Sequence, residues 1–251
     1  MEAGCFQHPH FTGYGAYLDL LASARWPDID ALNARMPASG PRFVGQDAAL
    51  LADGMHYEAR IAQGRIATRV ENWHDLFNAM VWMRHPTLKR ALNRQQCRHI
   101  DRIGTRERSP AQQALTQFDE SGVIVRVRDT TLLDLWDRHD WTSLFHANAA
   151  RWANGDIAIV AVVGHALMEQ RLVPGRLLVG KCLVVQGDED DGIARVVESI
   201  SAGASLCVPA DLRPLPLAGI PGWHEGQDAD FYAQEDYFRA RRDGRVYPRP
   251  V

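Results

Sequence analysis

The stretch from Asn72 to Trp82, NWHDLFNAMVW, places three polar side chains in an otherwise apolar run. On an ideal helix each residue advances by about 100°, so His74 and Asn78 lie close together with Asp75 beside them. The apolar residues fall on a separate, broad face. A compact patch of imidazole, amide and carboxylate can bind a metal, hydrogen-bond a substrate or hold a neighbouring loop.

Part of this patch has a simpler explanation at the start of a helix. Asn72 is a good N-cap, and Asp75 is the third helical residue, where a carboxylate suits the helix dipole and can reach back to the cap. We therefore interpret these two residues as helix-start residues. His74 and Asn78 have no capping duty, and they stay candidates for a base or metal ligand and for a positioning amide.

A second candidate is Gly164-His165, with Glu169 one helical turn later. A histidine between a buried strand and a helix lies where open α/β sheets usually bind ligands. His165 and Glu169 at this spacing can share a metal, or can form a general base and its orienting carboxylate. A structural histidine that donates to a carboxylate is the alternative.

The third candidate is the acidic pair Asp119-Glu120, which we place at a junction between a helix and a strand. Adjacent acids there can bind a divalent cation such as zinc or manganese, with histidines from elsewhere completing the ligand set. Because Ser121 and Gly122 follow, a solvated turn is the alternative interpretation.

A basic ridge is the fourth feature, since arginines recur every four residues at Arg90, Arg94, Arg98, Arg102 and Arg106. On a helix this spacing can follow the phosphates of a nucleic acid or bind an acidic partner. The chain has 28 Lys and Arg against 31 Asp and Glu, a formal net charge of -3. This balance favours a solvated helix face over a nucleic-acid binding surface.

The elements that hold these candidates follow from local signals. Pro86 should separate two helices between Asn72 and Ile103, and Ser109-Pro110 should start another that ends at the acidic pair. β-Branched and apolar runs predict strands at 122–128, 156–163 and 177–185, and the 156–163 strand should be covered on both faces at the centre of a sheet. Further helices are predicted at 16–24, 28–36, 130–152 and 193–202.

Residues 56–61 and 65–70 flank Ala62-Gln63-Gly64, which predicts a β-hairpin with glycine in the turn. The whole pattern predicts an α+β fold, predominantly helical around a small mixed β-sheet. We divide the chain into an N-terminal helical and loop segment at 1–40, an α+β core domain at 41–208, and an irregular C-terminal tail packed on the core at 209–251.

Several classes of protein are disfavoured. The four cysteines show no CxxC or Cys/His spacing, which argues against a zinc knuckle or a disulfide framework and favours a reducing compartment. A signal peptide and a membrane-spanning run are not recognisable, so we expect a cytoplasmic protein without a membrane partner. The chain also lacks a Walker loop, a G-x-S-x-G elbow, an HExxH motif and a dinucleotide fingerprint.

Five motifs occur in a fixed order: NWHDxFNAxxW at 72–82, FDExG at 118–122, GHAL at 164–167, PLPLAGIPGW at 214–223, and FY then FR within 231–239. Together they resemble a bacterial family catalogued as domain of unknown function 3025, from about Pro41 onward. The resemblance brings no activity with it. It implies that the polar motif residues share one pocket, namely His74, Asp75, Asn78, Asp119, Glu120 and His165.

A pocket of this composition suits metal-assisted or general acid/base hydrolysis better than redox chemistry. We therefore expect a hydrolase-like enzyme that acts on a small molecule, with catalytic residues His74, Asn78, His165 and Glu169 and a divalent metal held by His74, Asp119, Glu120 and His165. Two alternatives stay open. One is a non-enzymatic module that binds nucleic acid or an acidic partner through the Arg90–Arg106 ridge, and the other is a buried polar network that only stabilises the fold.

Overall fold

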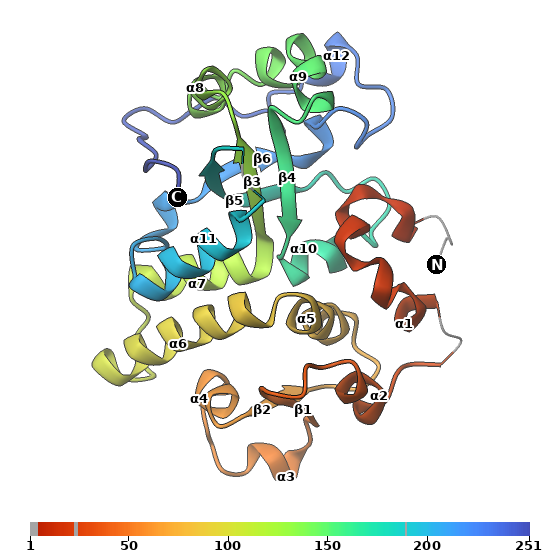
Figure 1. Ribbon diagram of the computed structural model, residues 1–251, viewed down its shortest axis with the longest axis vertical. Helices are drawn as coiled ribbons and strands as arrows, with labels where there is room; N and C mark the ends of the chain where they lie inside the picture. The colour runs from red at the N-terminus through yellow and green to blue at the C-terminus, as the bar shows by residue number, and fades with distance from the viewer. Residues whose placement is uncertain (1–4, 23–24, 189) are drawn as a thin grey trace.

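Four strands form the main sheet of the structure, a computed structural model that describes residues 5–22, 25–188 and 190–251 (Figure 1). Their order is β4-β3-β5-β6, with β3 Gly122–Val127, β4 Ile157–Val162, β5 Val179–Gln186 and β6 Arg213–Pro216. The sheet is mixed, because β3 runs parallel to β5 whereas the other two pairings are antiparallel. A second sheet contains only β1 Arg42–Gly45 and β2 Arg65–Thr68, which are parallel.

The prediction that 156–163 lies at the centre of the sheet is wrong. β4 is an edge strand and four of its six residues are only half-buried, while Val123, Ile124 and Val125 of β3 are fully buried. The apolar run reflects packing against the N-terminal 3-10 segment η2 Pro9–Tyr17, from which the Tyr14 hydroxyl donates to the Val162 carbonyl at 2.8 Å. Apolar content reports burial and says nothing of position in the strand order.

The predicted hairpin at 56–70 is also wrong, because its first arm is the helix α4 Tyr57–Ala62. The His56 side chain accepts from the Glu58 amide and caps this helix. Tyr57 and Ile61 are one turn apart, so the alternation that indicated a strand is equally a helical stripe. Gly64 does adopt a positive φ of 85°, but it leads from α4 into β2.

Most helix predictions are confirmed. Pro86 separates α5 Trp73–Arg84 from α6 Pro86–Ile103, and Ser109 forms a capping box with Gln112 at the start of α7 Pro110–Ser121. The other helices are α1 Leu18–Ala22, α2 Ile29–Ala34, α3 Ala48–Leu51, α10 His165–Gln170 and α11 Gly192–Ala202. Residues 23 and 24 of the first predicted helix lie outside the described residues.

The single helix predicted over 130–152 is instead three pieces: α8 Thr130–Arg138, the π-helical η3 Thr142–Ala147 and α9 Ala149–Ala153. The first break is at His139, whose φ of 58° places it in the left-handed region and ends α8. The sequence offers no glycine or proline at this point, so the break has no recognisable local signal.

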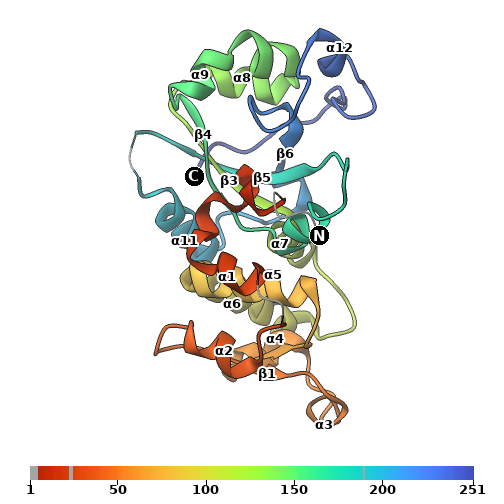
Figure 2. The same ribbon diagram turned by 90° about the vertical axis from the view of Figure 1, so that its right-hand side faces the viewer.

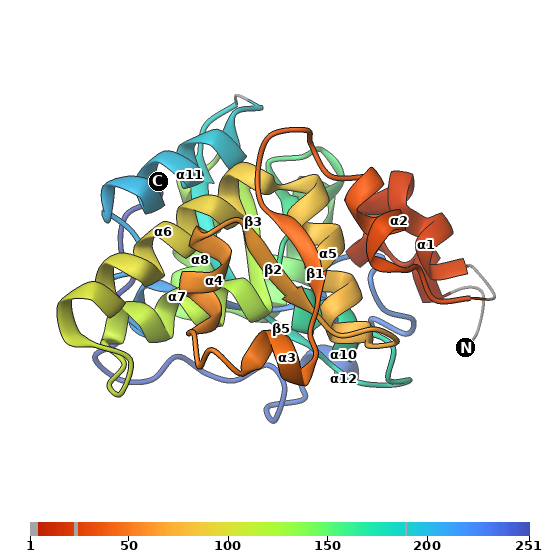
Figure 3. The same cartoon turned by 90° about the horizontal axis from the view of Figure 1, so that it is seen from below.

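The layers are arranged around α5 and α6, which lie between the two sheets (Figure 1). Seen from below, β1, β2 and α4 cover these two helices (Figure 3). The red N-terminal segment lies beside β4 (Figure 2). The C-terminal segment contributes β6 and the short helix α12 Ala229–Tyr232, and the Val251 amide donates to Val184 of β5 at 2.8 Å.

These elements make an α+β fold that is mostly helical, as predicted. Within the three described ranges, no helix combines the length and the hydropathy needed to cross a bilayer.

Candidate functional site

Two histidines that are 91 residues apart in sequence meet at the end of the main sheet where β3 begins and β4 ends (Figure 1). His74 lies in the first turn of α5, and His165 is the first residue of α10. Their Nε2 atoms are 3.0 Å apart, and the rings meet edge to face with centroids 4.5 Å apart. His165 is buried, whereas the His74 side chain retains 28% of its exposure, so the pair borders solvent on one side.

Each imidazole has a carboxylate behind it. The Nδ1 atom of His74 is 2.9 Å from Oε2 of Glu169, one turn along α10 from His165. The Nδ1 atom of His165 is 3.9 Å from Oδ2 of Asp119, which is too far for a hydrogen bond. This Nδ1 atom is therefore buried and has no partner.

Glu120 stands beside the two facing Nε2 atoms. Its Oε2 atom is 3.9 Å from Nε2 of His165. His74, Glu120 and His165 each offer one ligand atom, and these atoms lie within 4.8 Å of one another. Among the described residues, they are the group of histidine, cysteine and acidic side chains that could hold a metal ion. Burial lowers the pKa of His165 to about 3, against the opposing effect of Asp119, so its ring is neutral and can offer a lone pair.

A buried cation lies next to this cluster. Lys89 of α6 is 5% exposed, its Nζ is 2.6 Å from Oδ1 of Asp119, and the ammonium lies 5.5 Å from the centre of the Trp82 ring. Burial alone would raise the pKa of Asp119, but Lys89 and His165 outweigh it and hold the pKa below its usual value. Burial raises the pKa of Glu120, which has no such cation in contact.

Two glycines allow the elements that carry these groups to touch. The amides of Val163 and Gly164 both donate to the Gly122 carbonyl, at 2.9 and 3.0 Å. A Cβ atom on Gly164 would stand 2.5 Å from the Ser121 Cα, and one on Gly122 would stand 2.2 Å from the Phe118 carbonyl oxygen. Glycine at 164 lets the start of α10 lie against the acidic end of α7, and glycine at 122 lets the chain turn from α7 directly into β3.

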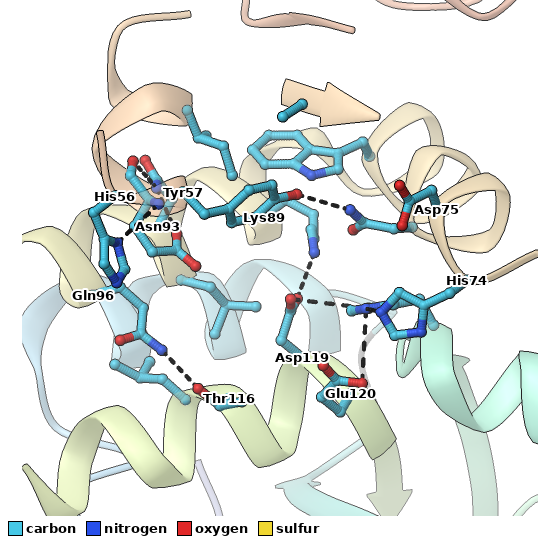
Figure 4. A pocket seen from close by; sticks show the side chains of 18 of the residues that line it. His56, Tyr57, His74, Asp75, Lys89, Asn93, Gln96, Thr116, Asp119 and Glu120 are labelled. Carbon is cyan, nitrogen blue, oxygen red and sulfur yellow. Dashed lines mark hydrogen bonds and ion pairs between the residues drawn. The ribbon is translucent and has the colours of Figure 1, made fainter. Parts of the chain in front are cut away.

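The cluster opens into a cavity of about 370 Å³ between α4, α5, α6 and α7. Figure 4 shows Lys89, Asp119, Glu120 and His74 converging at one side of it. Apolar residues such as Ile61, Leu92 and Leu115 form part of the remaining wall. Its polar side chains bond to each other: Asn78 Nδ2 donates to the Tyr57 hydroxyl at 3.1 Å, Asn93 Nδ2 to Glu58 Oε2 at 2.7 Å, and Gln96 Nε2 to Thr116 Oγ1 at 3.1 Å.

The fold thus brings His74, Asn78, Asp119, Glu120 and His165 to one cavity, with Glu169 behind His74. Asp75 also borders the cavity, but its amide is held by Asn72 at 3.0 Å, and its carboxylate pairs with Arg69 at 2.7 Å. The helix-start interpretation of Asn72 is therefore confirmed.

The basic ridge lies elsewhere. Arg90, Arg94, Arg98 and Arg102 are on α6, and Arg106 follows the end of that helix. The α6 residues that line the cavity are different ones, namely Lys89, Leu92, Asn93 and Gln96.

Sequence reasoning missed the contribution of α6 to the site. Lys89, Asn93 and Gln96 are buried polar residues at spacings of four and three, which is a helical stripe. This stripe is visible in the sequence, but it alternates with the arginine ridge, and together they appear as one polar helix. The hairpin interpretation placed Tyr57 and Glu58 on a strand, so their position on α4 at the cavity was not predicted.

Comparison with known proteins gives a family and no activity. No curated protein and no solved structure matches the chain. The family described as Protein of unknown function (DUF3025) matches residues 41–242, which include all the groups at the cavity. The chain belongs to this family of unknown function, DUF3025.

Proposed function

We propose that the protein is a hydrolase whose divalent cation is held by His74, Glu120 and His165. The observation that carries this proposal is the contact between the two Nε2 atoms, with a carboxylate facing each of the two Nδ1 atoms. A carboxylate behind a metal-binding histidine is the usual arrangement, because it fixes the tautomer and makes the ligand more basic.

For two neutral rings, proton accounting supports a cation between them. In a direct hydrogen bond one Nε2 must carry the proton, and a neutral ring then has a bare lone pair at Nδ1. If His165 is the donor, this lone pair is buried and faces Asp119; if His74 is the donor, it faces Glu169. With a cation, both Nε2 atoms coordinate and both Nδ1 atoms keep a proton that points to a carboxylate.

The distances agree with such a centre. The two Nε2 atoms are 3.0 Å apart, which is short enough for both to bind one zinc ion, since zinc–nitrogen bonds are about 2.0–2.1 Å long. Three protein ligands leave positions for water and substrate, as in catalytic zinc sites. A cation there would lower the pKa of its bound water to about 7 and polarise the bond under attack.

The remaining site residues have supporting roles in this proposal. Glu169 and Asp119 are positioning residues that orient His74 and His165, and Lys89 keeps Asp119 ionised. Asn78 is a positioning amide for a small-molecule substrate in the cavity. Asp119 Oδ2 faces Nδ1 of His165, the nitrogen that points away from the His74 contact, so we place Asp119 behind His165.

Elemental analysis tests the proposal. Protein incubated with zinc or manganese and then gel-filtered should retain one equivalent of one ion per chain. His74→Ala, His165→Ala and Glu120→Gln should retain almost none, while His146→Ala, which removes an exposed histidine of η3, should match the parent. A panel of esters, amides and phosphoesters then seeks hydrolysis that a chelator abolishes. If the parent retains no ion, or if the three variants retain as much as the parent, the proposal is wrong.

A further inference from the structure

The cavity wall formed by α5 has a regular order of polar groups. His74, Asn78 and Trp82 are each four residues apart, so they lie above one another on one face, with a rise of about 6 Å per step. All three line the cavity. A substrate with its reacting bond at His74 would therefore extend along Asn78 and toward Trp82.

Two of these residues have polar atoms without partners. Asn78 Nδ2 donates to the Tyr57 hydroxyl, which directs the amide so that Oδ1 is left without a partner. The indole Nε1 of Trp82 is likewise buried and has no partner. Seven buried side-chain polar atoms of the described residues lack a partner, and three of them belong to this one cavity: Asn78 Oδ1, Trp82 Nε1 and His165 Nδ1.

Such atoms are costly, because each has lost water and gained nothing. A cation on the other side of His165 would fix its Nδ1 proton toward Asp119, but it would leave the other two atoms unchanged. The wall therefore contains one unpaired acceptor and one unpaired donor, one helical turn apart and both closed to solvent.

The charges near this pair cancel within the protein. Lys89 is paired with Asp119, and Arg69 with Asp75. Arg108, the third cation of the lining, donates to Thr116 at 2.6 Å on the side of the cavity away from His74 and Asp75 (Figure 4), so neither Lys89 nor Arg69 is free of an acidic partner. The ligand group that fits here is uncharged, and it both donates and accepts.

We propose that Asn78 and Trp82 hold a secondary amide of the substrate, which makes the substrate a short peptide or an N-acyl amino acid derivative. The amide carbonyl accepts from Trp82 Nε1, and the amide N–H donates to Asn78 Oδ1. This inference rests on the proposed function, since the bond that is split lies at the cation one turn away. Neither free atom is open to water, so binding includes a small rotation of the side chains that cover them.

Three hydroxamates test the proposal by titration calorimetry with zinc-loaded protein. Acetohydroxamate reports the cation alone. N-acetylglycine hydroxamate adds one amide, and O-acetylglycolic hydroxamate replaces the amide N–H by an ester oxygen. We expect the amide probe to bind the parent about five- to tenfold more tightly than the ester probe, which is the usual effect of one neutral hydrogen bond.

Two variants assign the contacts. Asn78→Ala should weaken the amide probe to the level of the ester probe and leave the ester probe unchanged, because an ester has no proton to donate. Trp82→Phe should weaken both probes, since both have the carbonyl. Trp73→Phe makes the same substitution on α5 outside the cavity and should change neither. The zinc content of every variant shows that it is folded.

The outcomes separate the two proposals. If acetohydroxamate does not bind, the cation is wrong and the amide site falls with it. If acetohydroxamate binds but the parent does not distinguish amide from ester, or if Asn78→Ala weakens both probes equally, the amide site is overturned and the cation stands.

Discussion

The protein contains two histidine pairs in direct contact, and they differ in what surrounds them. His74 and His165 meet through Nε2 atoms at 3.0 Å, and His8 and His10 meet through Nδ1 atoms at 2.8 Å. The first pair joins helices distant in sequence, while the second is a local contact at the start of η2. The ring centroids are 4.5 Å apart in the first pair and 4.7 Å apart in the second, so this distance does not distinguish the pairs.

The acids around the two pairs show the difference, because each pair has one buried outer nitrogen without a partner, Nδ1 of His165 and Nε2 of His10. His8 Nε2 donates to the backbone carbonyl of Trp223 at 2.9 Å, so its Nδ1 can accept the His10 proton and one hydrogen bond explains the contact. Neither ring of this pair forms an ion pair with an acid of the described chain. The first pair has an acid behind each ring and Glu120 at its side. Contact between two imidazoles is therefore not enough to predict a metal site. The carboxylates of Asp119, Glu120 and Glu169 distinguish the first pair from the second.

The sharpest test of this contrast is stabilisation by zinc. At free zinc a thousand times the dissociation constant, binding should add about 4 kcal/mol to the free energy of unfolding. Thermal unfolding with and without zinc should show this shift for the parent and for His10→Ala, but not for His165→Ala. A shift that persists in His165→Ala and is lost in His10→Ala would place the ion at the second pair and contradict the proposed site.

The next effect concerns Lys89, the buried cation that is paired with Asp119 behind the first histidine pair. Lys89→Met leaves Asp119 without its cation beside a buried histidine, and we expect a loss of about 3 kcal/mol in the free energy of unfolding by urea. Lys89→Met combined with Asp119→Asn should recover most of it. Arg35→Met, which breaks the exposed pair with Asp19, should change the free energy of unfolding far less, because solvent screens an exposed pair. Equal losses in the buried and exposed pairs would contradict this interpretation.

A smaller change probes the acid behind His74. Glu169→Gln keeps the shape but weakens the acceptor for Nδ1, and the zinc dissociation constant should rise about 10- to 100-fold. Competition with a fluorescent chelator measures it, and the exposed Glu198→Gln of α11 is the control. An unchanged constant would mean that Glu169 does not orient the ligand.

The last effect belongs to the second pair and appears as pH dependence. Burial lowers the pKa of His10 to about 3, so below its unfolded pKa near 6.5 the unfolded chain binds a proton that the folded chain does not. Stability from this group is complete above pH 6.5 and is lost as the pH falls toward 3. His10→Leu should therefore flatten the slope between pH 6 and pH 4 by up to about 1.4 kcal/mol per unit. Urea unfolding at three pH values measures the slope, and His146→Leu should leave it unchanged.

The parts predicted correctly from sequence rest on local chemistry. Pro86 ends one helix and starts another because it lacks an amide hydrogen, and Ser109 caps α7 with its own side chain. His74, Glu120 and His165 could be named as candidates from residue type and from their positions at the ends of elements.

The parts that failed depend on partners distant in sequence. β2 pairs in parallel with β1, across a connection that contains two helices, and no turn signal announces such a pairing. The edge position of β4 depends on β3 lying between it and β5. Lys89 could not be assigned to the site without knowing that α6 turns this side chain toward Asp119 of α7.

The contact between Gly164 and Gly122 has a consequence for recognising this centre in other sequences. A chain can keep all three proposed ligands and still carry a side chain at Gly164, in which case its backbone must move away from Ser121, and the imidazole of His165 moves with it. Such a chain would have both histidines and the glutamate of the proposed centre, but their side chains could not reach one ion together. A search that asks for the ligands alone would count it, whereas a search that also asks for both glycines would set it aside.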